Sequence, residues 1–256
     1  MQVADVARAM EEIAPLRFAE SWDNVGLLLG DPAAPVSKVL LTIDLTPQVV
    51  AEATTLGATL VVAYHPPIFK PQNRVVAGDL AYAILRAGLS VYSPHTALDV
   101  AAGGTNDALG DLVGLAGRVP LRRHPADPER GIGRVGSVET TREALIAQVR
   151  ERLALPRLLV AGPLSGGARR VAVCAGAAGS LLGDAISAGA DVVLAGELSH
   201  HDALRADRAG ITAIVTLHSN AERLALPALA GRLRALLSAV TVHVSTEDKD
   251  PFSIVG

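Results

Sequence analysis

Short apolar runs alternate with Ala- and Leu-rich amphipathic segments along most of the chain, and this alternation limits the fold more than any other feature. A segment that predicts a helix follows each of the main runs, which are residues 38–44, 59–65, 89–95, 190–197 and 211–218. Because the runs are almost continuously apolar, they favour parallel strands that are buried on both faces. The sequence therefore predicts an α/β fold with mostly parallel sheets covered by helices.

The middle of the chain breaks this alternation. Residues 122–167 are rich in Pro, Gly, Arg and Glu, and they carry one strong helix pattern, from Thr141 to Leu153, without a clear pair of core strands. The length of 256 residues suits one large domain or two modest ones. We therefore predict an N-terminal α/β lobe over residues 1–121, a connector with one helix over 122–167, and a C-terminal α/β lobe over 168–256.

Composition argues against several classes of function. The net charge is −3 and aromatic residues make up only 3% of the chain, and both features weigh against nucleic-acid binding. A local basic rim from Arg118, Arg122 and Arg123 keeps that hypothesis open as the least favoured one, to be tested by salt-dependent binding. No uninterrupted apolar run reaches the length of about 18 residues that a membrane span needs.

Cysteine usage and the N-terminus both bear on the compartment. The lone Cys174 excludes an intramolecular disulfide and a cysteine zinc cluster, which suits a reducing environment. The first residues form an amphipathic helix pattern that contains acidic residues and lacks the apolar block of a signal peptide. We therefore expect a soluble protein of the cytoplasm.

Residues that bind metals or move protons stand where the predicted strands end. These strand-end residues are Asp44, His65, His95, Glu197 and His218. In an open parallel sheet, ligands bind beyond the carboxyl ends of the strands. Further candidates follow closely in sequence: Asp99 comes four residues after His95, Glu222 comes four residues after His218, and His200 and His201 follow Glu197. The joint pattern predicts a site at this edge of the sheets.

The spacing of His218 and Glu222 is compatible with a metal site. If a helix begins at Ser219, both side chains reach one point near its start. An imidazole beside a carboxylate suits zinc, manganese or iron(II), and a cation also relieves repulsion between neighbouring carboxylates. Taken alone, the same spacing is also common on solvated helices.

Each of the other candidates has a structural alternative. His65 suits a core histidine that bonds a backbone carbonyl, and His95 with Asp99 suits a turn that leads into a capped helix. Glu197 suits a carboxylate near a helix dipole, with His200 and His201 exposed after it. Of the remaining histidines, we expect His124 to be solvated and His243 to be structural.

Two loop segments complete the set of candidates. Residues 174–180 form a Gly-rich turn between a strand and a helix; they could bind an anion through backbone N–H groups, although tight packing of small residues is the favoured interpretation. Cys174 at its start fits an inert buried thiol better than a nucleophile. Residues 20–32 carry the only Trp and an Asp23-Asn24 pair, and they predict either a loop over the site or a hairpin before the first core strand.

Five motifs occur in an order that resembles a known family. They are "SWDNVGLLLGD", "YHPPIF", "SPHTALD", "GELSHHDAL" and "HSNAER". Together they resemble the NIF-three-like family, also described as type-two homologs of GTP cyclohydrolase I or as dinuclear metal-centre hexameric proteins. The resemblance spans nearly the whole chain, from about Val3 to the "STEDKDPF" segment near its end, and residues 122–167 contribute little to it.

The resemblance implies two α/β lobes with a metal pair in the cleft between them, and a ring-shaped hexamer. The family's metal ligands fall on His65, Asp99, His218 and Glu222. The family's pocket residues fall on His95, Glu197, His200 and His201. Tyr64 stands where many bacterial members carry a histidine, and this form resembles the branch that includes eukaryotic members. The substitution removes one expected imidazole, so the resemblance implies one or two divalent ions, of Zn, Fe, Mn or Ni.

Two hypotheses for function follow from different classes. The first is a metal-dependent hydrolase of a phosphoester, a nucleotide or a cyclic amide. In it, His65, Asp99, His218 and Glu222 hold the metal, while Glu197, His95 or His201 carry protons or orient a small-molecule substrate. Tyr64, His200 and Asp44 line the pocket. The second is a metal-binding or regulatory scaffold without enzymatic activity. A comparison of metal-dependent turnover before and after loss of the ligands distinguishes the two.

Overall fold

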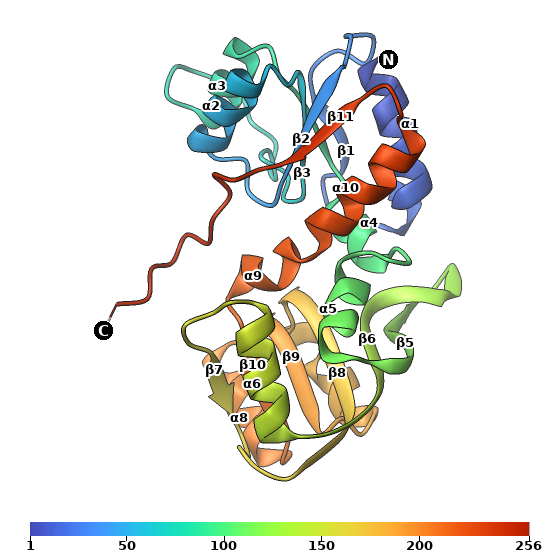
Figure 1. The fold of residues 1–256 in the computed structure, drawn as a ribbon, viewed down its shortest axis with the longest axis vertical. Coiled ribbons are helices and arrows are strands. Elements are labelled where there is room, and N and C mark those ends of the chain that lie inside the picture. Colours follow the sequence, from blue (N-terminus) through green and yellow to red (C-terminus); the bar gives the residue numbers. More distant parts are fainter. Residues whose placement is uncertain (256) are drawn as a thin grey trace. The chain divides into compact units, whose positions relative to one another are not determined.

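The structure is a computed structural model that describes residues 1–255, and it consists of two compact units (Figure 1). Unit 1 contains residues 1–101 and 226–249, and unit 2 contains residues 102–225 and the segment from Asp250 on. The chain thus leaves unit 1, completes most of unit 2, and returns. These divisions differ from the boundaries predicted at 121/122 and 167/168.

Unit 1 is built on a five-stranded sheet with the order β1-β4-β3-β2-β11. The four strands β4, β3, β2 and β11 are parallel, and only the edge strand β1 is antiparallel to β4. This sheet confirms the mostly parallel arrangement that its apolar runs predict. Its strands are β1 (Gly26–Leu29), β2 (Lys38–Thr42), β3 (Leu60–Ala63), β4 (Ser90–Ser93) and β11 (Thr241–Val244).

Helices cover both faces of the unit 1 sheet (Figure 1). One apolar core joins the sheet to α1 (Val3–Ile13) and α10 (Ala225–Leu236), and a second joins its other face to α2 (Pro47–Leu56) and α3 (Leu80–Arg86). The signals at the ends of α2 act as the sequence predicts. The Thr46 hydroxyl accepts from the Val49 N–H, and Gly57 ends the helix at φ +68°. The remaining helices of this unit are η1 (Leu16–Phe18) and α4 (His95–Val100).

Unit 2 is built on a six-stranded sheet with the order β5-β6-β8-β9-β10-β7. Only β8, β9 and β10 run parallel to one another, so this sheet is mixed and the mostly parallel prediction is wrong here. The expectation that 122–167 holds no pair of core strands is also wrong, because β6 pairs with both β5 and β8. The strands are β5 (Ala116–His124), β6 (Asp127–Thr141), β7 (Leu159–Ala161), β8 (Gly167–Ala177), β9 (Val192–Glu197) and β10 (Thr212–Val215).

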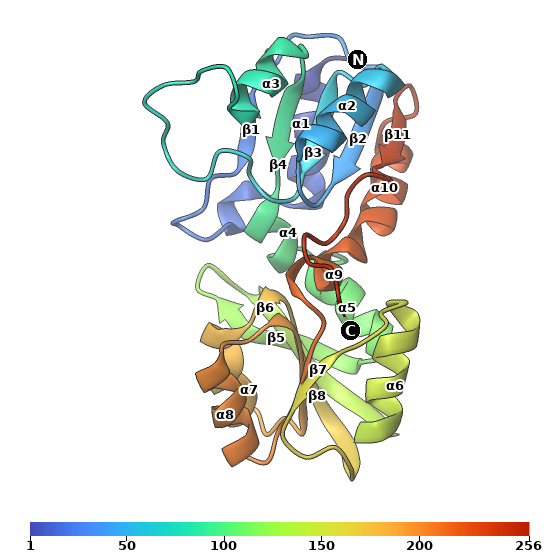
Figure 2. The same cartoon turned by 90° about the vertical axis from the view of Figure 1, so that its left-hand side faces the viewer.

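Helices also lie on both faces of the unit 2 sheet (Figure 2). One core involves α5 (Thr105–Val113), α6 (Arg142–Arg152) and α9 (His218–Arg223), and the other involves α7 (Leu182–Ser187) and α8 (His200–Arg208). The α6 helix is the one predicted in the connector, and Thr141 caps it by accepting from the Ala144 N–H. The short helix η2 (Gly179–Leu181) leads into α7.

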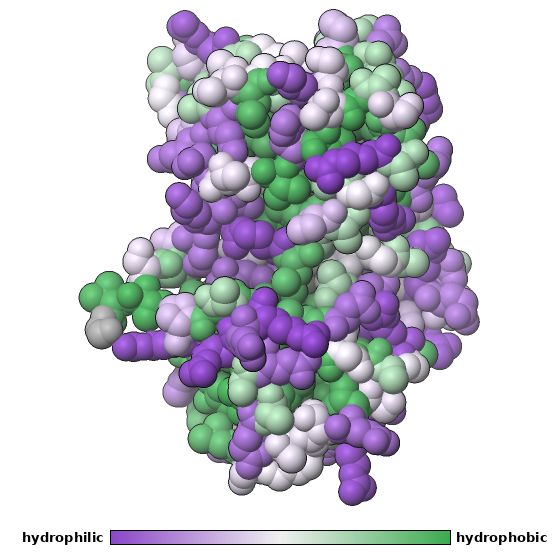
Figure 3. All heavy atoms as spheres, viewed as in Figure 1, coloured by the Kyte–Doolittle hydropathy of each residue, from purple (hydrophilic) through white to green (hydrophobic). Residues whose placement is uncertain are grey.

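The surface and the helix lengths bear on membrane insertion. Among the described residues, no helix is both long enough and apolar enough to cross a membrane. The face drawn in Figure 3 mixes hydrophilic and hydrophobic residues. The apolar residues needed for stability lie in four buried clusters, two in each unit.

Candidate metal centre

His65 follows β3 at its carboxyl end. The backbone N–H groups of Tyr64 and His65 still bond the carbonyls of Thr42 and Ile43, at 2.9 and 3.0 Å, so the ladder with β2 continues to this point. Nδ1 of His65 lies 2.9 Å from Oδ1 of Asp44, which follows β2. The neighbouring ends of β2 and β3 thus place the Asp44 carboxylate against Nδ1 of His65, so that Nε2 is the ring nitrogen that Asp44 does not contact.

Tyr64 and Asp99 form a buried pair in unit 1. The Tyr64 hydroxyl donates to Oδ1 of Asp99 at 2.6 Å, and the residues are 3% and 7% exposed. Asp99 lies on α4, which follows β4, the strand next to β3. The parallel pairing of β3 and β4 explains why residues 35 positions apart meet.

His95 begins α4 in an unusual conformation and is held by a buried carboxylate. Its φ is +29°, a value that few residues other than glycine adopt. Nδ1 of His95 lies 2.7 Å from Oδ1 of Asp23, whose side chain is fully buried, and the Thr96 N–H donates to Oδ2 of Asp23 at 3.1 Å. Burial raises the pKa of Asp23, but the hydrogen bonds from His95 and Thr96 outweigh it and hold the pKa below its ordinary value.

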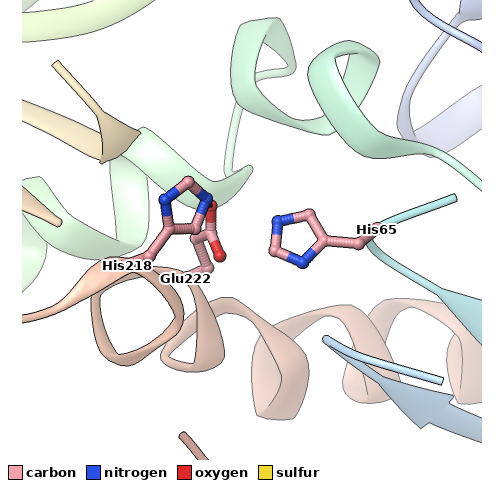
Figure 4. A group of neighbouring side chains, drawn as sticks. All are labelled: His65, His218 and Glu222. Carbon is pink, nitrogen blue, oxygen red and sulfur yellow. Dashed lines mark ion pairs between the residues drawn. The ribbon is translucent and has the colours of Figure 1, made fainter. Parts of the chain in front are cut away.

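In unit 2, His218 and Glu222 lie one helical turn apart on α9 and point toward each other (Figure 4). Nε2 of His218 is 3.2 Å from Oε1 of Glu222, which is buried, and Nδ1 of His218 is 3.3 Å from Oε2 of Glu197 at the end of β9. The structure therefore brings together three of the predicted residues, with the carboxylates of Glu197 and Glu222 on either side of the His218 imidazole. The helix includes His218 itself, one residue earlier than expected.

Two glycines leave space beside this pair, and a leucine with positive φ precedes it. A Cβ at Gly176, which has φ +63°, would stand 2.6 Å from Oε1 of Glu222 and 3.2 Å from Nε2 of His218. A Cβ at Gly196 would stand 2.8 Å from the His218 carbonyl oxygen. Leu217, directly before His218, has φ +68°. Strain of this kind concentrates at functional sites, because the surrounding structure must hold it in place.

The geometry of the His218–Glu222 pair fits a bound cation. Two ligands about 2.1 Å from one tetrahedral zinc ion lie about 3.4 Å apart, close to the 3.2 Å between Nε2 and Oε1. A neutral imidazole has one N–H, so it cannot donate to Glu197 and Glu222 at once. A proton or a metal ion between His218 and Glu222 satisfies both partners, and the space next to Gly176 is kept free of a side chain.

The same arrangement recurs at three histidines. His65, His95 and His218 each place Nδ1 against a carboxylate oxygen, from Asp44, Asp23 and Glu197 respectively. A carboxylate that accepts from Nδ1–H fixes the tautomer and places the lone pair of the neutral ring on Nε2. Asp44 and Glu197, predicted as a pocket residue and a proton carrier, thus contact histidines directly.

The remaining candidates are His200, His201 and Cys174. His200 and His201 are exposed at the start of α8, their rings contact each other with centroids 5.5 Å apart, and neither imidazole has a hydrogen bond or ion pair with a described residue. Cys174 is buried in β8, as expected of an inert thiol. The Gly-rich turn after it serves close packing, since Gly176 and Gly196 approach each other.

Sequence reasoning assigned no role to Asp23, Gly176 or Leu217. The "DN" dipeptide and the "CAGAAGS" turn were visible as unusual segments, but nothing local to them names the histidines they contact. The strained conformations of His95 and Leu217 have no sequence signal, because both residue types ordinarily adopt negative φ.

A family model matches residues 1–251 of the chain, and its description is Duf34/NIF3 (NGG1p interacting factor 3). The chain belongs to the Duf34/NIF3 family. Among curated Duf34/NIF3 relatives, the "GTP cyclohydrolase 1 type 2 homolog" of Clostridium perfringens is 31% identical over the full length of both chains. The "NIF3-like protein 1" of Drosophila melanogaster is 36% identical over all of this chain and 90% of its own.

Solved structures agree with this assignment. A hypothetical protein of Staphylococcus aureus superposes with a TM-score of 0.92 at 26% identity, covering all of this chain and 99% of its own. A Bacillus cereus protein related to NIF3 has the same fold, with a TM-score of 0.94 at 22% identity over all of this chain and 99% of its own. The Duf34/NIF3 fold, with two sheets covered by helices, is therefore the fold of this chain.

Proposed function

We propose that this protein binds one or two divalent metal ions and uses them to hydrolyse a small molecule: a phosphoester, a nucleotide or a cyclic amide. The observation that carries the proposal is the His218–Glu222 pair, whose facing ligand atoms are 3.2 Å apart beside a space that Gly176 leaves open. The names of relatives such as the "GTP cyclohydrolase 1 type 2 homolog" support hydrolysis as the reaction class.

We assign the metal ligands to His65, Asp99, His218 and Glu222. His218 and Glu222 of unit 2, drawn in Figure 4, turn an imidazole and a carboxylate toward one point, and His65 of unit 1 is assigned to the same ion on the resemblance to the family. Two imidazole nitrogens and a carboxylate oxygen suit Zn, Fe, Mn or Ni better than the oxygen-preferring Mg or Ca. Asp99 offers Oδ2 as well as the Oδ1 that accepts from Tyr64.

The other residues have distinct tasks in this proposal. Asp44 and Glu197 orient His65 and His218 through Nδ1, which places the lone pair of each neutral ring on Nε2. His95 accepts and releases a proton through Nε2, because Asp23 occupies its Nδ1. His200 and His201 are assigned to the substrate pocket and to proton transfer only as predictions. A divalent cation, when bound, supplies hydroxide near neutral pH by lowering the pKa of a water.

Metal analysis of the purified protein tests the ligand assignment. The wild-type protein is expected to bind at least one divalent ion per chain, whereas Glu222→Gln and His65→Ala lose it. His124→Ala is the matched control, since His124 lies at the end of β5 beside the β5–β6 turn and has no role in the proposed site. Substoichiometric metal in the wild-type protein under metal-replete conditions would exclude the site.

Turnover assays test the enzymatic part separately. A panel of phosphoesters, nucleotides and cyclic amides is compared between wild type, Glu222→Gln and His124→Ala, with and without added metal. An activity that needs metal and disappears only in Glu222→Gln supports the hydrolase. A protein that binds metal but turns over none of the panel favours the alternative, a metal-binding scaffold without enzymatic activity. The words "interacting factor" in the family description support that alternative.

Assembly and location stay predictions. We propose a homohexamer, on the resemblance to the family alone, and a cytoplasmic location, on the lone Cys174. Sedimentation velocity of the full chain tests the first, since a hexamer of 26.4 kDa chains separates clearly from a dimer.

A further inference from the structure

Three rings of unit 1 gather around one point beside the predicted site. The ring centroids of Trp22 and Phe69 are 6.0 Å apart, and those of Trp22 and Phe69 lie 6.2 and 6.5 Å from the His95 centroid. The planes of these pairs are inclined at 58°, 77° and 84°. No two of these rings stack face to face, the arrangement that would cover one whole face of each ring.

The exposure of two of these three rings, Trp22 and Phe69, is unusual for the chain. Trp22 is 59% exposed and Phe69 is 47% exposed, in a protein with one Trp, three Phe and three Tyr. By contrast, Phe18, Tyr64 and Tyr92 are 3–4% exposed. Packing in the core therefore does not explain why two of the few large aromatic side chains lie together in solvent.

The trio is held by the Asp23-Asn24 dipeptide. Asp23, next to Trp22, is the buried acceptor for Nδ1 of His95. The Asn24 side chain donates to the carbonyl of Ile68, next to Phe69, at 2.5 Å. Two adjacent residues thus fix three rings that come from separate segments. Phe69 lies on the long connection between β3 and α3, which projects from one side of unit 1 in Figure 2. Two exposed rings held in place beside His95, whose side chain is 15% exposed, lose little entropy when a ligand binds.

We propose that Trp22, Phe69 and His95 bind a planar nitrogen heterocycle of nucleobase size. The aromatic faces stack on the ring of the ligand, as they do with nucleobases at many sites, and Nε2 of His95 makes a hydrogen bond with its polar edge. The proposal deepens the proposed function by selecting a substrate with such a ring. The centroids of the His95 and His65 rings are 5.4 Å apart, so a heterocycle bound at His95 lies next to a proposed metal ligand. The reaction of the bound heterocycle therefore rests on the proposed function. Binding of the heterocycle itself needs no metal.

The single tryptophan gives a direct readout of binding. Emission of Trp22 is titrated with inosine and with uridine, and ribose serves as the control ligand that lacks the heterocycle. The variants are Phe69→Ala, the conservative Phe69→Tyr, Asn24→Ala, and Phe252→Ala as a matched control, because Phe252 is an exposed phenylalanine elsewhere in the chain. The same titration is repeated on Glu222→Gln in the presence of a chelator.

Saturable quenching by inosine and uridine but not by ribose is the expected result. Affinity should fall about tenfold or more in Phe69→Ala and in Asn24→Ala, and remain near wild type in Phe69→Tyr and Phe252→Ala. Quenching that ribose reproduces, or that Phe69→Ala leaves unchanged, overturns the proposal. So does a change in Trp22 emission with protein concentration that disappears in Phe69→Ala, because the rings then form a contact between copies of the chain.

The chelator arm separates this inference from the hydrolase proposal. If heterocycle binding persists in Glu222→Gln while the wild-type protein hydrolyses nothing, the binding site stands and the hydrolase fails. If the wild-type protein shows metal-dependent turnover while no heterocycle quenches Trp22, the hydrolase stands and this inference fails.

Discussion

The hydroxyl of Tyr64 donates a 2.6 Å hydrogen bond to Oδ1 of Asp99, and both side chains are buried. Tyr64 stands where the family resemblance places a histidine in many members, and Asp99 is a proposed metal ligand. In this chain the Tyr64 phenol thus donates to the proposed ligand Asp99, at the position where other members of the family carry an imidazole. This contact gives Tyr64 a role that does not depend on whether it ever binds metal.

We expect Tyr64→Phe to lower the free energy of unfolding by about 1.5–3 kcal/mol, since a hydrogen bond to a charged group contributes that much. Urea denaturation measures the change. The matched control is Tyr92→Phe: Tyr92 is equally buried, but its hydroxyl has no hydrogen-bond partner among the described residues. An equal loss in both variants would show that the Tyr64–Asp99 bond contributes nothing specific.

Gly176→Ala should disrupt the His218–Glu222 pair. The added Cβ would stand 2.6 Å from Oε1 of Glu222, so the carboxylate must move and bound metal should be lost. Gly189→Ala is the control, because Gly189 has a similar φ of +68° but nothing within 4 Å of the added atom. Both variants lose about 1–2 kcal/mol of stability through the left-handed backbone. Retention of metal by Gly176→Ala would contradict the assigned site.

Glu197→Ala tests whether Glu197 orients His218. Loss of a carboxylate that holds Nδ1 should weaken metal binding by about 10–100-fold without abolishing it, whereas Glu222→Gln removes a proposed ligand. Competition with a metal indicator measures both affinities. The exposed Glu139, on β6, provides Glu139→Ala as the control. If Glu197→Ala binds metal as tightly as the control, the contact of 3.3 Å to His218 has no orienting role.

Glu52 makes stability depend on pH in a defined direction. Burial raises its pKa, but hydrogen bonds from Ser245, Thr246 and Glu247 outweigh burial and hold the pKa below its usual 4.5. A carboxyl whose pKa is lowered by folding stabilises the protein above the unfolded pKa, and this stabilisation is lost as pH falls through the folded one. The stability gap between wild type and Glu52→Gln should therefore be constant at neutral pH and close below about pH 4.5.

Thermal denaturation across pH 3–7 measures that gap, with Glu151→Gln on the exposed surface of α6 as the control. A gap that widens toward acid pH would mean that Glu52 is not stabilised as a carboxylate by the 245–247 segment.

The sequence predicts unit 1 better than unit 2, for a physical reason. The three central strands of unit 1, β2, β3 and β4, are mostly apolar and buried on both faces, and such runs are easily recognised. In unit 2, β5 is mostly exposed and β6 is interrupted by Gly131, Gly133 and Gly136, so neither has the apolar pattern of a core strand. Their pairing depends on contacts with β8 that local composition does not encode.

For the candidate site, the sequence indicates which residues end strands but not which partners hold them. Asp44, His65 and His95 follow parallel strands, and the structure places each beside a partner from a neighbouring segment. The role of Asp23 lies beyond sequence reasoning, because its contact with His95 joins residues 72 positions apart.

The return of the chain to unit 1 sets an order for its biosynthesis. A ribosome releases all of residues 102–225 before it has made residues 226–249, which supply α10 and the edge strand β11. Until those residues emerge, β2 presents an unpaired edge and the apolar face that α10 covers stays open to solvent. The nascent N-terminal segment must therefore be kept from aggregating while the inserted unit is already free to fold, so a truncation before residue 249 would harm the part of the protein made first.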